Sequence, residues 1–205
     1  MMKNLFITAA ILAAFSAPQV FAQAKTLQGF SVGANVNVVT ASSEVTSGGL
    51  LVRLGEGSVN GSVQGAYTFA LTDSFLIGLG GTYTIGDTKA GTATVNGIGV
   101  TATGTNPQFG LYIEPGFAVG SSTELYGKLS YNRMDGKLLL TNGTSVGGSL
   151  TFNGVGFGAG VRTFFDKNLY AQVEFNQVNY SGQTSFGITY KPSGTSGSLG
   201  MGYKF

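Results

Sequence analysis

The chain has 205 residues, which is enough for one domain, and its formal net charge is only +2. Charged residues make up 10% of the sequence, against about 25% in soluble domains. The sequence has no cluster of Lys and Arg of the kind that binds nucleic acid. It contains no cysteine and no histidine. Disulfide scaffolds, thiolate metal sites and Ser-His-Asp catalysis are therefore excluded, and no metal or other cofactor is expected.

The first segment has the features of a secretory signal peptide. Lys3 provides a positive charge, residues 5–17 form a short apolar region, and Pro18 ends it. That region is shorter than the roughly 20 residues of a membrane-spanning helix. Small residues at alternate positions place the cleavage site after Ala22 or after Ala24. We expect residues 1–24 to be removed and residues 25–205 to form the mature domain.

The mature chain alternates bulky apolar residues with small or polar ones at a period of two, which is the pattern of β-strands. In residues 75–85, for example, Phe75, Leu79 and Tyr83 share one face, while glycine and threonine occupy the other. No run of apolar residues is long enough for a transmembrane helix. The pattern predicts eight strands, at residues 32–38, 63–71, 75–85, 108–119, 125–131, 154–162, 169–175 and 199–205.

Tight turns and long segments alternate between the predicted strands. Turn-forming residues occupy 72–74, 120–122 and 166–168. Short turns on one side and long loops on the other are typical of outer-membrane barrels, with the short turns, and hence both termini, in the periplasm. The alternation of Phe186, Ile188 and Tyr190 indicates that the last strand can start early, and a ten-stranded barrel is a minor alternative on that ground. The predicted extracellular loops, rich in Ser, Thr and Gly, are 40–61, 86–106, 135–151 and 179–196.

The two faces of the predicted strands differ in a way that indicates a membrane protein. One face carries bulky Phe, Tyr, Leu, Ile and Val, with Arg133 near a strand end as its only charge. The other is mostly Gly, Ala, Ser, Thr, Asn and Gln, which suit the crowded interior of a small barrel but make a poor soluble exterior. Because lipid tolerates no unpaired strand edges, we predict an all-β fold: a closed antiparallel eight-stranded transmembrane β-barrel.

Four charged residues fall on the small-residue face: Glu114, Lys128, Arg162 and Glu174. Their distances from the neighbouring tight turns predict that Glu114 pairs with Lys128, and Arg162 with Glu174, each across its own hairpin. Two acids and two bases in one lumen can neutralise one another. This charge cluster can act as a gate across a narrow pore or as a structural plug, and the plug is the favoured interpretation.

The C-terminal residues Leu199, Met201, Tyr203 and Phe205 alternate up to a terminal phenylalanine, and residues 154–170 form a glycine-rich strand and hairpin. In both features the chain resembles the small outer-membrane β-barrel family, which includes the transmembrane domain of outer membrane protein A, outer membrane protein X and the opacity proteins. The resemblance implies that the C-terminal residues are an assembly signal for the barrel-assembly machinery, read after export by the secretion machinery. It also implies contact with outer-membrane lipid and lipopolysaccharide.

Two features depart from the pattern of that family. The sequence ends at Phe205, without the peptidoglycan-binding domain of full outer membrane protein A. Pro115 lies in the middle of a predicted strand, where it cannot donate to the ladder, so a bulge is expected there.

The favoured function is a structural or surface barrel, whose loops contact surface ligands or neighbouring copies. Enzymatic activity is not expected: known barrel enzymes depend on a histidine, which this sequence lacks, and its few acids form no recognisable motif. A narrow porin for small solutes is the first alternative, because inward glycines such as Gly80 and Gly160 would leave volume unfilled. A lateral conduit for small apolar molecules is the second.

Overall fold

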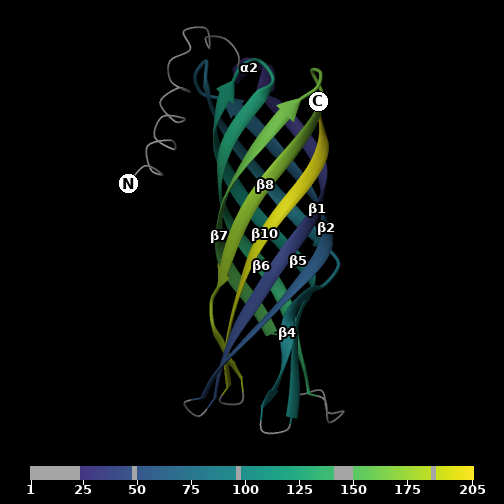
Figure 1. Ribbon diagram of the computed structural model, residues 1–205. Coiled ribbons are helices and arrows are strands. Elements are labelled where there is room, and N and C mark those ends of the chain that lie inside the picture. Colours follow the sequence, from purple (N-terminus) through teal and green to yellow (C-terminus); the bar gives the residue numbers. More distant parts are fainter. Residues whose placement is uncertain (1–23, 48–49, 96–97, 141–149, 186–187) are drawn as a thin grey trace, which may run out of the picture.

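A computed structural model describes residues 24–47, 50–95, 98–140, 150–185 and 188–205. Eight long strands, each antiparallel to its neighbours, close into a barrel because the first strand pairs with the last. The ring runs in chain order and its strands are tilted against the barrel axis (Figure 1). The strands are β1 (Gly29–Ser47), β2 (Leu50–Ala70), β3 (Phe75–Ile85), β5 (Ile98–Val119), β6 (Thr123–Leu140), β7 (Leu150–Phe164), β8 (Leu169–Tyr180) and β10 (Ile188–Lys204).

Three short elements lie outside this ring. The helix α2 (Ala24–Leu27) precedes β1, β4 (Thr88–Val95) pairs with β5, and β9 (Gln183–Ser185) pairs with β10. Within the described residues, no helix is long and apolar enough to cross a membrane. The barrel has two unlike ends (Figure 1). We call the end with the three short turns, α2 and the C-terminus the turn end, and the opposite end, with the long hairpins, the hairpin end.

The two faces of the barrel wall follow the predicted alternation. Leu111, for example, points outward and is 64% exposed, whereas its neighbour Tyr112 points into the lumen and is 4% exposed. Apolar side chains therefore cover the outside and polar ones gather inside, which is the reverse of a soluble domain. Outward side chains that are more than half exposed include Val36, Val59, Phe157, Val173 and Leu199.

The predicted long loops are wrong over most of their described length, because the strands continue through them. β1 and β2, for instance, stay paired without a register shift as far as Ser47↔Leu50. These extensions lose the apolar outer face by which the strands were identified, but they keep the backbone ladder that defines a strand. The described parts of 40–61, 86–106, 135–151 and 179–196 lie largely in strands.

The last strand starts early, as the alternation of its residues indicates. β10 begins at Ile188 and contains Tyr190, whereas Phe186 lies outside the described residues. The ten-stranded alternative is wrong, because eight strands already close the ring. In the described parts of the chain, β4 pairs only with β5 and β9 only with β10.

Pro115 does not introduce the predicted bulge. β5 and β6 keep the same register on both sides of it, with Ile113 opposite Leu129 and Gly116 opposite Tyr126. A proline removes one N–H from the ladder but adds no residue to the strand. The alignment of the inward side chains of β5 and β6 is therefore continuous past this position.

Candidate functional site: a charged layer in the barrel lumen

Five charged side chains from four adjacent strands meet inside the barrel. Glu114 lies on β5, Glu124 and Lys128 on β6, Arg162 on β7 and Glu174 on β8. Each occupies an inward position of its strand, and none is more than 9% exposed. We refer to these five residues as the charged layer.

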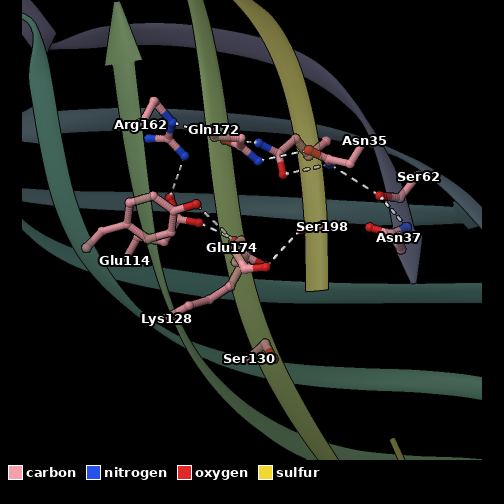
Figure 2. A network of polar contacts seen from close by, with 12 residues as sticks. Asn35, Asn37, Ser62, Glu114, Lys128, Ser130, Arg162, Gln172, Glu174 and Ser198 are labelled. Atoms are coloured by element: carbon pink, nitrogen blue, oxygen red, sulfur yellow. Dashed lines mark hydrogen bonds and ion pairs between the residues drawn. The ribbon is translucent and has the colours of Figure 1, made fainter. Parts of the chain in front are cut away.

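Each base of the charged layer is held by two carboxylates. Figure 2 labels four of the five residues, namely Glu114, Lys128, Arg162 and Glu174. Lys128 Nζ lies 3.2 Å from Glu114 Oε1 and 2.6 Å from Glu174 Oε2. Arg162 Nη2 lies 3.1 Å from Glu114 Oε2, and Arg162 Nη1 lies 2.9 Å from Glu124 Oε2. Glu114 thus bridges both bases, and the ion pairs form one connected chain. Burial of charge is tolerated only with such pairing.

Arg162 does not pair with Glu174, contrary to the expectation from the sequence. On β8 it lies opposite Gln172, whose Oε1 accepts a hydrogen bond from Arg162 Nε at 3.2 Å. Glu174 is two positions nearer the hairpin end, where it binds Lys128 instead. The other expected pair, between Lys128 and Glu114, is confirmed.

Glu124 belongs to the charged layer although the sequence pattern did not single it out. The apolar alternation starts this strand at Leu125, one residue after Glu124, whereas β6 begins at Thr123. Glu124 therefore shares the inward face with Lys128 and lies directly opposite Arg162. The even spacing between positions 124 and 128 was the available signal. With Glu124 included, the layer holds three acids and two bases, a formal charge of −1.

Inward tyrosines surround the two bases. Lys128 Nζ lies 4.1 Å from the ring centroid of Tyr112. Arg162 Cζ lies 4.8 Å from the ring centroid of Tyr126 and 5.3 Å from that of Tyr170. Such cation–π contacts stabilise charged bases that are removed from water. The charged layer is thus packed by rings as well as by ion pairs.

The same tyrosines fill space that the inward glycines were expected to leave open. A Cβ on Gly80 would lie 2.5 Å from Tyr112 Cζ, and a Cβ on Gly160 would collide with the ring of Tyr126. Each of these glycines therefore leaves room for an aromatic ring from the neighbouring strand. Such packing also fixes the register between the two strands. The expectation of unfilled volume at these positions is wrong, and the argument for an open pore that depended on it is lost.

An amide network connects the charged layer to the opposite wall of the barrel (Figure 2). Gln172, which accepts from Arg162, donates through Nε2 to Asn35 Oδ1 at 2.9 Å. Asn35 Nδ2 donates to Ser62 Oγ at 3.2 Å and to Gln64 Oε1 at 3.3 Å. Gln64 Nε2 donates back to Gln172 Oε1 at 3.1 Å. Hydrogen-bonded side chains therefore reach from β7 and β8 to β1 and β2.

A cavity of about 150 Å³ lies on the hairpin side of the charged layer. Lys128 and Glu174 line one end of it, Met134 and Pro192 line the other, and most of the wall between them consists of amide and hydroxyl side chains. Arg162, deeper in the barrel, does not line it. We call this cavity the vestibule, and it ends at the charged layer.

The charged layer is not arranged as a metal site. In the parts of the chain that the structure describes, no three or more His, Cys, Asp or Glu side chains are grouped so that they could hold a metal ion. The carboxylates of the layer face Lys128 and Arg162 instead. Their chemistry is charge neutralisation inside the lumen.

Comparison with protein families identifies the fold. A family model described as "Outer membrane protein beta-barrel domain" matches residues 7–205. The chain belongs to this family. No curated protein matches the chain.

Several solved structures are similar to the chain. Neisserial surface protein A is 15% identical, with 86% of the chain and 97% of that protein covered and a TM-score of 0.52. Ail, the attachment invasion locus protein of Yersinia pestis, is 17% identical, with 85% and 99% covered and a TM-score of 0.44. The outer membrane protease OmpT from Escherichia coli is 10% identical, with 86% and 97% covered and a TM-score of 0.47. At these identities the likeness concerns the fold alone.

Membership of an outer-membrane family explains the apolar exterior, which lies against lipid. Arg133 is on this outer face, as expected, and is exposed. At the seam between β10 and β1, Phe205 N donates to Phe30 O at 2.8 Å, and the two ring centroids are 5.8 Å apart. The four residues of the predicted C-terminal signal all point outward: Leu199, Met201, Tyr203 and Phe205.

Proposed function

We propose that the protein is a structural or surface barrel of the outer membrane whose lumen does not conduct. The charged layer is the observation that carries this proposal. A solute crossing the barrel would have to separate Lys128 or Arg162 from carboxylates that lie 2.6–3.2 Å away. Leaving one partner of a buried ion pair uncompensated is strongly unfavourable. The tyrosine rings packed over glycine remove further space from the same region.

We further infer that the turn end faces the periplasm and the hairpin end faces the cell exterior. Short periplasmic turns and longer extracellular connections are the usual layout of such barrels. The paired extensions of β1 and β2, and of β5 to β7, would then form an ordered surface above the membrane. This surface is the part of the barrel available to surface ligands, lipopolysaccharide or neighbouring copies.

In this proposal the two ends of the chain direct its delivery. The N-terminal segment, which ends at Ala22 or at Ala24, acts as the signal peptide for the secretion machinery. The outward-pointing C-terminal side chains of β10 and Phe205 are what the barrel-assembly machinery reads.

We infer a non-enzymatic function from the residue types present. The sequence holds no histidine and no cysteine. The buried carboxylates are engaged by Lys128 and Arg162, so they are poorly placed to take a proton from a substrate.

Planar-bilayer recording of the refolded protein tests the closed lumen. We expect no steady conductance from the parent protein or from Arg53→Ala, whose side chain is exposed and lies outside the lumen. A narrow porin would instead conduct in the parent, with a preference for cations because the charged layer has an excess acid, and Arg162→Ala would alter that selectivity. Steady conductance of this kind would overturn the proposal.

Flux into liposomes tests the second alternative. A lateral conduit would carry no ion current but would accelerate the uptake of a small apolar dye. Uptake at the rate of protein-free liposomes is the result that we expect from a closed structural barrel.

Thiol labelling of intact cells tests the orientation. The natural chain has no cysteine, so a single introduced thiol reports its own position. A membrane-impermeant maleimide should label Thr46→Cys at the hairpin end of intact cells. It should label Lys167→Cys, in the third short turn, only after the outer membrane is permeabilised. The opposite pattern would reverse the orientation.

A further inference from the structure

The turn end of the barrel is covered by the first residues of the folded chain. In α2, Ala24 is 0% exposed and Leu27 is 3% exposed. A helix of four residues has no stability of its own, so this segment is held in place by the barrel. Both residues belong to one buried apolar cluster with side chains from β3, β5, β7 and β8, namely Leu76, Ala118, Phe164 and Tyr170.

Hydrogen bonds tie the same segment to three points around the barrel mouth. Ala24 N donates to Asp73 O in the first short turn at 3.1 Å. Thr26 Oγ1 donates to Ser121 O in the second short turn at 3.1 Å. Lys204 Nζ, at the end of β10, donates to Thr26 O. Anchors on three sides hold the segment across the mouth rather than against one edge of it.

The pattern of small residues predicts cleavage after Ala22 and after Ala24 equally well. The burial of Ala24 distinguishes between these two sites. Cleavage after Ala24 would remove its buried methyl group and the N–H that binds Asp73. It would also place a charged amino group on Lys25, directly after the buried position, and charge beside apolar groups is unfavourable. Cleavage after Ala22 keeps Ala24 in the mature chain and puts the amino group on Gln23.

We propose that the mature chain begins at Gln23 and that residues 24–27 form a stopper that closes the turn end of the lumen. The inference rests on the proposed export of the chain and cleavage of its signal peptide. The stopper and the charged layer close the barrel in series. The charged layer is then accessible to solutes only through the vestibule at the hairpin end.

The intact mass of protein purified from outer membranes tests the cleavage site. We expect a mature chain that starts at Gln23, either as free glutamine or as its cyclised form. A chain that starts at Lys25 would overturn this half of the proposal, whatever the result of the conductance measurement.

Thiol labelling of the folded protein tests the stopper. A single cysteine at Ala118, which is 5% exposed and faces α2 in the buried cluster, should react slowly with a small thiol reagent. Leu27→Ser removes the apolar anchor of the stopper and should accelerate the labelling by about tenfold or more. Lys25→Ser changes an exposed side chain of the same segment and is the matched control, so its rate should equal that of the parent.

Heat-modifiable migration on gels verifies that each labelled variant is a folded barrel, and Leu27→Ala serves as a milder replacement if Leu27→Ser does not fold. Equal labelling rates with the Leu27 and Lys25 changes would show that the segment does not cover the mouth. Such a result would leave the charged layer, and hence the proposed closed lumen, unaffected, so the two proposals fail separately.

Discussion

Single residues in this barrel are constrained by what faces them, and identical residue types have unequal roles. Gly160 makes room for the ring of Tyr126, whereas nothing lies within 4 Å of the place where Gly197 would carry a Cβ. Arg162 is buried between carboxylates, while the side chain of Arg53 is 74% exposed. Composition cannot separate such cases, because the difference lies in the opposing side chain.

Gly160→Ala should destabilise the folded barrel by about 1–3 kcal/mol, since the added methyl group forces the Tyr126 ring out of its place. Gly197→Ala makes the same chemical change on the outer face and should shift stability by only a few tenths of a kcal/mol. Urea unfolding of both variants in detergent micelles measures the difference. Equal midpoints would contradict the packing of the ring over Gly160.

Arg162→Ala should cost about 3–5 kcal/mol, because it leaves Glu114 and Glu124 buried without this partner. Arg53→Ala, which breaks an exposed pair with Glu44, should cost about 0–1 kcal/mol. The same unfolding measurement compares the two arginines. A small effect at Arg162 would mean that water or another side chain replaces it in the lumen.

At the scale of secondary-structure elements, the turns and the strand extensions have different physical bases. The third short turn is built by Asp166, whose Oδ1 accepts hydrogen bonds from Asn168 N and Leu169 N, both at 2.7 Å. The hairpin extensions instead rely on apolar contacts inside the hairpin end of the barrel, such as the buried cluster of Met134, Phe152 and Tyr190. Lowering the pH should therefore destabilise the third short turn, whereas removing apolar side chains should destabilise the hairpin end.

The backbone hydrogen bonds to Asp166 hold the pKa of its carboxyl below the usual value of 3.8. A lowered pKa in the folded state means that the ionised form stabilises the fold above pH 4, and that this contribution is lost as the pH falls through the folded-state pKa. Asp166→Asn should abolish that part of the acid dependence. The parent-minus-variant difference in unfolding midpoint between pH 6 and pH 2 measures it, and a constant difference would contradict the role of the carboxylate.

Phe152→Ala should loosen the hairpin end while leaving the barrel intact, because its cluster lies beyond the charged layer on β6, β7 and β10. Amide hydrogen exchange should accelerate by at least several-fold in the described residues at the hairpin end of these strands. Phe157→Ala removes the same ring from the outer face of β7 and is the matched control. If exchange accelerates equally throughout the barrel in the Phe152 variant, the hairpin end is not a separate unit of stability.

At the scale of the whole molecule, closure of the ring brings the first and the last strand together. Pairing of β1 with β10 closes the edges that these two strands would otherwise expose to lipid. Phe205 lies at this seam beside Phe30, and Lys204, between the outward residues of β10, reaches inward to α2. The C-terminal end of the chain thus presents one face to the membrane and the other to the stopper.

Phe205→Ala should reduce the amount of folded protein in the outer membrane several-fold, since it removes the terminal residue of the proposed assembly signal. The purified variant should still refold in detergent, because the change removes exposed ring contacts with Phe30 and Tyr203 but no backbone hydrogen bond. Phe165→Ala, an exposed ring in the third short turn, is the control. Outer-membrane levels equal to those of the parent would argue against an assembly signal at Phe205.

Local alternation by itself determined the fold class, the number of barrel strands, the outward and inward faces and the ion pair between Glu114 and Lys128. These features depend on a period of two within each strand and on tight turns, both of which are readable along the chain. The same alternation did not predict the strand extensions in the long connections, because towards the hairpin end the outer face is no longer apolar even though the ladder continues.

Only the tertiary structure decided the partners of Arg162, the inclusion of Glu124, the filling of glycine sites by rings and the placement of residues 24–27 in the turn end. Each depends on which residues lie opposite one another once the ring has closed. That alignment follows from the stagger of all eight strands together, so no single segment of sequence contains it. The charged layer was thus foreseeable as a set of inward residues, but its connections were not.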